Sequence, residues 1–299
     1  MVISASRRTD IPCLYSEWFL NRLKAGYVIT RNPMNYRQLS KISLSKDYVD
    51  CIVFWTKDPL NLIAYLGSID NMGYKYGFQF TLNPYDKTIE KNLRDKEDII
   101  NTFKRLSNRI GKEKIIWRYD PIILTEHMNI DYHKEKFKYL CDRLHNYTDK
   151  VIISFVDIYA KIKRIGINEM SVENINIMAS IFGEIAREYD MLISTCCEKD
   201  LLIYGIKNEG CLSMPFLESI CNYSLKLNMD RNQRKECKCV QSIDVGAYNT
   251  CTNGCIYCYA TKNQTMAINH DPVSDMLSGN ICENDKLTER SVFLNKSEV

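Results

Sequence analysis

The chain lacks both a long hydrophobic stretch and a strong excess of charge of either sign. No apolar run approaches the ~20 residues that a membrane-spanning helix needs, and the opening MVISASRRTDIP has no apolar signal core. The 40 basic and 37 acidic residues give a net charge of +3, so composition offers no general nucleic-acid or membrane footprint. We therefore expect a cytoplasmic protein that does not bind membranes, while a local basic patch for nucleic acid is left open.

Repeats and low-complexity segments are also missing, and histidine is scarce. The four histidines, His127, His133, His145 and His270, are scattered without metal-ligand spacing, which favours structural or surface roles. A chain of 299 residues is long enough to bury roughly 75% of the surface that its unfolded form exposes. One large folded domain is therefore expected, with a core of its own.

Short β-rich runs alternate with longer stretches of helical period. Two of the runs, CIVFW and VIISF, are apolar throughout or nearly so, as are parallel strands buried on both faces. The pattern predicts an α/β fold, a (β/α)8 or partial TIM-like barrel over residues 1–260, followed by a polar C-terminal extension over 261–299. Strands are expected at 2–6, 27–30, 51–55, 76–81, 114–119, 150–155, 191–195 and 240–245, and helices at 15–24, 97–109, 133–144 and 172–189.

Polar residues follow several of the predicted strands. In such a barrel the carboxyl ends of the strands face the active site. Arg7 and Arg8 follow the first strand and Arg118 ends the fifth, where a guanidinium offers a rigid fork for a carboxylate or a phosphate. The alternative, that these are solvated loop residues or partners of acidic neighbours, is equally compatible with the sequence.

Cysteine is the residue type that the chain has in excess. Thirteen are present, ten of them from Cys196 onward, and reduced cytosolic thiols at this density favour metal binding over disulfides. Cys251, Cys255 and Cys258 have the spacing Cys-x3-Cys-x2-Cys, which can direct three sulfurs to one iron–sulfur cluster. Three ligands on a four-iron (4Fe-4S) cluster leave one iron open for a substrate or cofactor. The alternative is a zinc site completed by a distant Cys or His.

A second group of cysteines lies upstream of this motif. Cys196 and Cys197 are adjacent, and one of them, preferably Cys196, joins Cys211, Cys237 and Cys239 to give four thiols. Four thiols suit a second 4Fe-4S cluster or a structural zinc ion, and ordinary reduced thiols are the third alternative. The remaining cysteines lack neighbours in sequence and are expected to be buried apolar thiols: Cys13, Cys51, Cys141, Cys221 and Cys282.

The stretch Cys-Thr-Asn-Gly-Cys-Ile-Tyr-Cys resembles the cluster motif of the radical S-adenosylmethionine superfamily. The resemblance implies a cluster on Cys251, Cys255 and Cys258 whose free iron binds S-adenosylmethionine, with Tyr257 beside the adenine. It also implies an electron donor, such as flavodoxin or ferredoxin, and a radical that abstracts hydrogen from a substrate.

Almost the whole chain resembles an uncharacterised bacterial domain family of unknown function, whose C-terminal cysteines are similar to that cluster motif. The segments that carry the resemblance are SASRRTDIP, VDCIVFWTKDP, WRYDPI, RNQRKEC and DVGAYNTCTNGCIYCYA. Radical enzymes usually carry the motif after the first barrel strand, whereas here it follows the last predicted one. A circularly permuted barrel removes this difference and sets Arg7 and Arg8 beside the cofactor, although no Gly-Gly-Glu segment is present there.

The sequence thus predicts an enzyme that cleaves S-adenosylmethionine reductively and acts on a small-molecule or otherwise unknown substrate. Two alternatives belong to other classes. One is an iron–sulfur protein for electron transfer or redox sensing, in which both clusters are fully ligated. The other is a nucleic-acid modifying protein stabilised by zinc, which the paired arginines favour and the small net charge does not.

Overall fold

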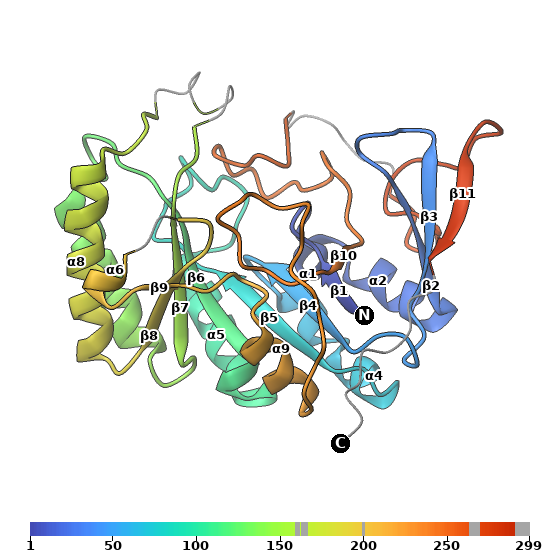
Figure 1. Cartoon of the computed structure of the whole chain (residues 1–299), viewed down its shortest axis with the longest axis horizontal. Helices are drawn as coiled ribbons and strands as arrows, with labels where there is room; N and C mark the ends of the chain where they lie inside the picture. Colours follow the sequence, from blue (N-terminus) through green and yellow to red (C-terminus); the bar gives the residue numbers. More distant parts are fainter. Residues whose placement is uncertain (159–161, 163–166, 199–200, 263–269, 291–299) are drawn as a thin grey trace.

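Eight parallel strands form the central sheet of this computed structural model, which describes residues 1–158, 162, 167–198, 201–262 and 270–290 (Figure 1). The sheet order is β10-β1-β4-β5-β6-β7-β8-β9, and every neighbouring pair runs parallel. The strands are β1 (Val2–Ala5), β4 (Cys51–Thr56), β5 (Tyr76–Thr81), β6 (Ile115–Ile122), β7 (Lys150–Phe155), β8 (Leu192–Thr195), β9 (Lys207–Asn208) and β10 (Ile243–Asp244).

Helices connect the strands and bury their apolar faces against the sheet. They are α1 (Ile11–Leu14), α2 (Ser16–Ala25), α3 (Leu60–Ile63), α4 (Leu66–Asn71), α5 (Lys96–Ile110), α6 (Ile130–Leu144), α8 (Val172–Glu188) and α9 (Met214–Cys221), with 3-10 turns at Lys112–Lys114 and Leu202–Tyr204. The three longest helices begin at side-chain caps: Asp95 accepts from the amide of Glu97, Asn129 from that of Tyr132, and Ser171 from that of Asn174. Each cap satisfies an amide that the first helical turn leaves without a partner.

The core consists of apolar strand residues and the helix faces that cover them. Phe54, Phe78 and Phe80 on neighbouring strands are fully buried, and Phe80 packs on Phe103 of α5 with ring centroids 4.8 Å apart. Farther along the sheet the ring of Phe137 from α6 stacks on Phe182 from α8 at 4.1 Å. Because strands covered on both faces leave little room for polar side chains, the sequence runs here are nearly continuous in apolar residues.

A smaller sheet lies at the opposite end of the molecule from α6 and α8 (Figure 1). It contains β2 (Tyr27–Arg31), β3 (Gln38–Ser43) and β11 (Lys286–Arg290), with β2 and β3 antiparallel and β11 parallel to β3. The strand predicted at 27–30 therefore exists as β2, but it belongs to the smaller sheet. The prediction that it is one of the barrel strands was wrong. The polar stretch after residue 260 supplies β11, while residues 263–269 and 291–299 lie outside the described residues.

Of the predicted (β/α)8 or partial TIM-like barrel, the described strands do not show the closed form. Within the described part of the chain, β10 and β9 are the two ends of the strand order and do not pair with each other. The α/β class with eight parallel strands is confirmed, but the eighth strand is the two-residue β9, which the sequence did not predict. β10 does lie next to β1, with Ile3 opposite Ile243, as a permuted barrel requires. The permutation itself stays a prediction.

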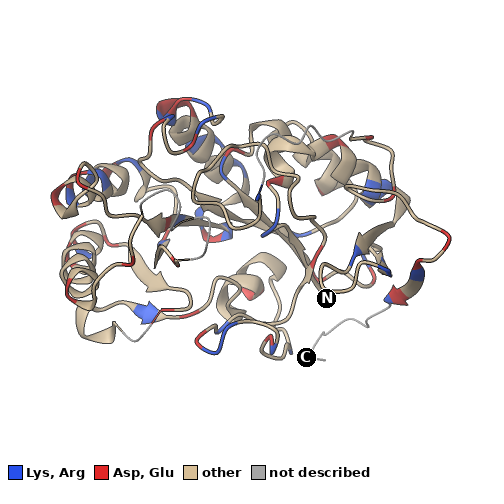
Figure 2. Ribbon diagram, turned by 90° about the horizontal axis from the view of Figure 1, so that it is seen from above, with Lys and Arg blue, Asp and Glu red and all other residues tan. Residues whose placement is uncertain are grey.

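Charged residues are intermixed over the fold rather than segregated (Figure 2). This distribution agrees with the near-neutral total charge of +3. Among the described helices, none combines the length and the apolar character that crossing a bilayer needs.

Candidate metal centres

A cavity of about 1040 Å³ opens at the carboxyl ends of the parallel strands. Its walls include residues that end or follow the strands, such as Arg7 after β1, Lys57 after β4 and Arg118 in β6. Both predicted cysteine groups reach it, since its lining contains Cys196, Cys197, Cys211, Cys237, Cys239, Cys251, Cys255 and Cys258. Segments that are more than fifty residues apart in the sequence thus present their thiols to one open cavity.

The loop that carries Cys251, Cys255 and Cys258 is held by backbone pairing with residues 89–92. Glu90 and Cys255 form an antiparallel bridge, and the amide of Ile256 donates to the carbonyl of Ile89 at 3.0 Å. Gly254, between Cys251 and Cys255 in the sequence, has a φ of +74°. A Cβ at this position would lie 3.0 Å from Asn92 Nδ2. Only glycine enters this left-handed conformation readily, so this turn between the cysteines depends on it.

Asp10 ties the same loop to the segment that follows β1. Its carboxylate accepts from Asn253 Nδ2 at 3.0 Å, from the amide of Lys57 at 2.8 Å and from the amide of Cys13 at 3.1 Å. Burial raises the pKa of Asp10 to about 6, although these hydrogen bonds act in the opposite direction. Burial likewise raises the pKa of the Cys251 thiol to about 12. A cationic metal centre would favour the thiolate form that ligation needs.

Tyr257 belongs to a buried charged network rather than standing free. Its hydroxyl donates to Glu90 and accepts from Asn83 Nδ2 at 3.1 Å. Glu90, only 1% exposed, also pairs with Lys57 Nζ at 2.8 Å and with Lys96. Burial opposes ionisation of Glu90, but the two ammonium groups lower its pKa to about 2. The predicted adenine contact thus has a structural role in fixing the loop, and its ring also lines the cavity.

The spacing of the thiols differs between the two groups. A single tetrahedral zinc ion with Zn–S bonds near 2.3 Å needs sulfurs about 3.8 Å apart. Among the described residues, two cysteine triads have all sulfurs within 4.8 Å of one another, Cys196 with Cys211 and Cys239, and Cys196 with Cys197 and Cys237. These thiols can hold a metal ion. The 251–258 loop forms no such compact triad among the described residues.

Cys197 is a candidate ligand that the sequence interpretation left out. The sequence predicts that one of the two adjacent cysteines, preferably Cys196, faces the site, whereas in the structure Cys197 shares a triad with Cys196 and Cys237. Its φ of +64° is a left-handed conformation that costs a non-glycine residue about 1–3 kcal/mol and that is enriched at ligand sites. Hydrogen bonds with the neighbouring thiols of Cys196 and Cys237 lower the pKa of Cys197 against the effect of burial, and the charge of Arg234, which pairs with Asp157, acts in the same direction as the thiols.

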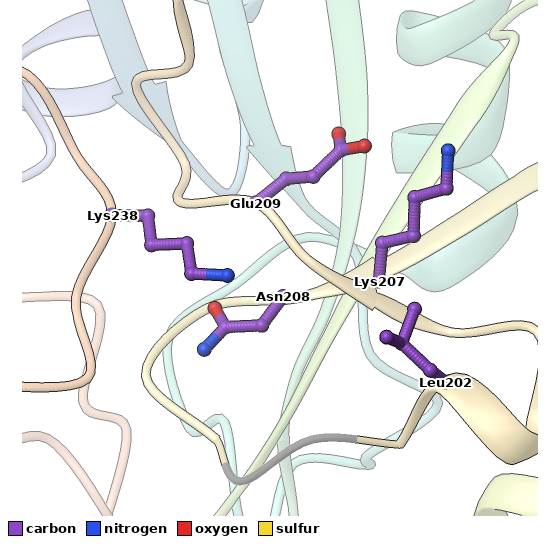
Figure 3. Close-up of a pocket in the computed structure, with 5 residues that line it drawn as sticks. All are labelled: Leu202, Lys207, Asn208, Glu209 and Lys238. Atoms are coloured by element: carbon purple, nitrogen blue, oxygen red, sulfur yellow. The ribbon is translucent and has the colours of Figure 1, made fainter.

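Asn208 and Gly210 bring the two segments of the second group together. Asn208 Nδ2 donates to the carbonyls of Glu198 at 2.9 Å and Glu236 at 3.2 Å, which joins the residues next to Cys197 and Cys237. A Cβ at Gly210 would lie 2.5 Å from the backbone of Lys238, so this approach requires glycine. A second cavity, of about 260 Å³, lies behind this junction, and Figure 3 shows Lys238 extending toward Asn208 in it.

Arg118 is a direct partner of the second cysteine group. Its Nη1 lies 2.6 Å from Cys211 Sγ, and its Nη2 contacts the carboxylate of Asp120. Burial, the largest effect, lowers the pKa of Arg118, but the charges of Cys211 and Asp120 more than offset it and raise the value. Arg118 therefore keeps its positive charge beside the thiols, where it favours the thiolate form of Cys211.

Arg7 and Arg8 both line the cavity, but they lie in different surroundings. The guanidinium of Arg7 lies over the ring of Trp55, 4.9 Å from its centre, whereas that of Arg8 lies over Tyr248 at 5.2 Å. The Arg7 amide donates to Asp244 Oδ2 at 2.8 Å, which fixes the turn after β1. The apolar run CIVFW predicts only a strand at Trp55, and no sequence signal indicates that its side chain lines the cavity.

Comparison with known proteins identifies the family and little else. The family model described as Domain of unknown function (DUF1848) matches residues 2–260. The chain belongs to the DUF1848 family. No curated protein matches the DUF1848 chain. A solved structure, a "putative alpha-L-fucosidase" from Bacteroides thetaiotaomicron, is 12% identical over 58% of this chain and 72% of that chain. Its TM-score is 0.28, a likeness too weak to carry an argument.

The other cysteines and the central histidine of the DUF1848 domain have mixed surroundings. Cys51, Cys141 and Cys221 are buried as predicted, Cys13 is half-buried, and Cys282 is exposed, which corrects the expectation for that residue. His133 is fully buried, accepts from the Tyr119 hydroxyl at 2.7 Å and donates from Nε2 to the carbonyl of Ile123 at 2.9 Å. A structural role for this histidine is thus confirmed by its contacts.

Proposed function

We propose that this protein is a radical S-adenosylmethionine enzyme whose 4Fe-4S cluster is held by Cys251, Cys255 and Cys258. The observation that carries the proposal is that the three thiols of one loop line the same large cavity as a second cysteine group. A volume of about 1040 Å³ accommodates a cofactor together with a substrate, since pockets for drug-sized molecules span roughly 300–1,000 Å³.

The donor set of the loop fits a cluster with one open position. It offers three sulfurs, and their separation is wider than a single tetrahedral ion requires. When bound, the cluster and S-adenosylmethionine supply a radical, because one electron from a donor such as flavodoxin or ferredoxin breaks a carbon–sulfur bond of the sulfonium. The chain's own contribution is to position these groups and to keep water away.

Individual residues of the chain have defined tasks in this proposal. Glu90, with Lys57 and Lys96, anchors the ring of Tyr257 and the backbone of Cys255, so that the loop geometry is set before the cofactor binds. Asp10 holds Asn253 and thereby the start of the loop. Such prearranged ligands reduce the ordering that metal binding must impose.

The first experiment measures 5′-deoxyadenosine formation by anaerobically reconstituted protein given S-adenosylmethionine and dithionite. The triple variant Cys251→Ala, Cys255→Ala, Cys258→Ala should form none, while Cys282→Ala, which removes an exposed thiol, should match the wild type. No product from a wild type fully loaded with iron and sulfide would refute the proposed activity. An electron-transfer or redox-sensing protein, the alternative class, would then be the better interpretation.

We assign a second metal to the group around Cys196. Cys196 belongs to two triads, one with Cys211 and Cys239 and one with Cys197 and Cys237, and within each triad the sulfurs lie within 4.8 Å of one another. This spacing favours thiolate ligands of a single ion over those of an auxiliary 4Fe-4S cluster. Metal and sulfide analysis of the purified protein separates the two, since zinc brings no sulfide. Cys196→Ser should remove this metal and leave the iron of the other loop, whereas retention of all metal would contradict the assignment.

A further inference from the structure

Three side-chain groups in the cavity wall have no hydrogen-bond partner within the described part of the chain, the hydroxyl of Thr9 and the N–H donors Arg7 Nη2 and Trp55 Nε1. Buried N–H groups without acceptors are rare in native proteins, because each gives up its hydrogen bonds with water. The other two tryptophans differ, since Trp18 Nε1 donates to the Ser274 carbonyl at 2.8 Å and Trp117 Nε1 to the Leu82 carbonyl at 2.9 Å. Trp55 is thus the tryptophan whose N–H lacks an acceptor within the described residues, and it lies in the wall of this cavity.

The same place concentrates positive charge. The guanidinium carbons of Arg7 and Arg118 lie 4.9 and 5.2 Å from the centre of the Trp55 ring. Arg118 is fully engaged by Cys211 and Asp120. The Arg7 guanidinium makes only a 3.4 Å contact from Nη1 to Ser242 Oγ, and no salt bridge to a carboxylate is found for it among the described residues. One edge of a buried cation is thus left for a ligand.

The position of this edge is defined by both cysteine groups. The Tyr259 hydroxyl, from the end of the 251–258 loop, donates to the Arg7 carbonyl at 2.7 Å. Cys211 and Cys239 of the other group line the same cavity as Arg7. Burial, the largest effect, lowers the pKa of Arg7, whereas the charges of Cys239, Asp244 and Cys211 raise it. A ligand that accepts from Arg7 and Trp55 would therefore lie between the two candidate metal centres.

We propose that Arg7 Nη2 and Trp55 Nε1 bind an oxyanion, a carboxylate or a phosphate group, of the molecule on which the enzyme acts. A guanidinium edge and an indole N–H are both pure donors, so their common ligand must be an acceptor, and the charge of Arg7 selects an anion. The assignment of this oxyanion to a substrate rests on the proposed function, whereas the existence of an oxyanion site does not.

The test measures thermal unfolding of the reconstituted full-length protein against increasing acetate or inorganic phosphate, with chloride at equal ionic strength as the reference. The concentration dependence gives a Kd for each probe. Arg7→Lys should weaken binding of the preferred probe by about tenfold or more, as expected for a hydrogen bond to a charged group. Trp55→Phe, which keeps the ring and removes the N–H, should weaken it by about fivefold.

The matched control is Arg31→Lys. Arg31 also lines the cavity, but Asp285 occupies its fork at 2.8 and 2.9 Å, so its substitution should change the Kd by less than about twofold. Whichever of the two probes binds more tightly identifies the group as carboxylate or phosphate. Equal stabilisation of all four proteins, or none by either probe, would overturn the site.

A separate measurement distinguishes substrate from cofactor. If Arg7→Lys abolishes binding of S-adenosylmethionine but leaves acetate and phosphate binding unchanged, Arg7 serves the cofactor and the inference is wrong. If the variant loses oxyanion binding and still forms 5′-deoxyadenosine, the inference is supported. Loss of oxyanion binding in a protein whose wild type forms no 5′-deoxyadenosine supports the site and refutes only the proposed function.

Discussion

The buried carboxylate of Glu90 should be the strongest single determinant of the cluster loop. It is 1% exposed and receives the ammonium of Lys57 at 2.8 Å, the ammonium of Lys96 and the hydroxyl of Tyr257. Its pKa of about 2, lowered by the two ammonium groups against the effect of burial, keeps it ionised at every pH of ordinary study. Glu90→Gln removes this charge and leaves two cations facing each other in the protein interior.

Breaking a buried ion pair by removing one partner costs about 3–5 kcal/mol. For a chain of 299 residues this corresponds to a fall in melting temperature of about 5–10 °C. Because the Glu90 carboxylate also holds the hydroxyl of Tyr257, the residue before Cys258, the variant should bind iron less completely on anaerobic reconstitution. Calorimetry and iron analysis measure the two effects.

The matched control is Glu97→Gln. Glu97 also pairs with a cation, Arg143, but at the surface, where such a pair contributes at most about 1 kcal/mol. If Glu90→Gln melts within about 2 °C of Glu97→Gln and takes up the same amount of iron, the loop does not depend on the Glu90 network.

Three further predictions concern other parts of the chain. Gly254→Ala should lower iron uptake on reconstitution and destabilise the protein by about 1–2 kcal/mol, because a residue with a Cβ is strained at φ +74° and would contact Asn92. Unchanged iron uptake would contradict this account of the turn. Burial lowers the pKa of His133 to about 4, so the unfolded chain, with its histidine near 6.5, takes up the proton first as the pH falls. Stability should therefore decrease from pH 6.5 to 4 by up to about 3 kcal/mol in urea titrations, and His133→Gln should lack this component of the slope. Asp275→Asn removes the carboxylate that pairs with buried Arg22, and limited proteolysis should then cut residues 270–290 faster than in the control Glu289→Gln, an exposed pair on the same tail.

Much of the sheet could be predicted from local pattern alone. The strands expected at 76–81 and 150–155 coincide with β5 (Tyr76–Thr81) and β7 (Lys150–Phe155), and the helix expected at 172–189 is α8 (Val172–Glu188). Continuous apolar runs and capped helical periods are local signals that burial on both faces produces. The run at 27–30 carries the same signal, yet it pairs with the nearby β3 (Gln38–Ser43) in the smaller sheet, because an apolar run does not specify which strand it will pair with.

The sequence by itself determined the chemistry that the protein offers: cysteine spacing that singles out Cys251, Cys255 and Cys258, and a second group upstream. Only the tertiary structure decided which of these residues meet. It brought Cys197 into the second group through a left-handed backbone, and it set Arg7 against Trp55 between the two groups. It also left the sheet open across the described residues, with β10 beside β1. The spacing of the cysteines can be read directly from the sequence. A cavity that both groups share forms only when parallel strands bring their carboxyl ends to one edge of the sheet.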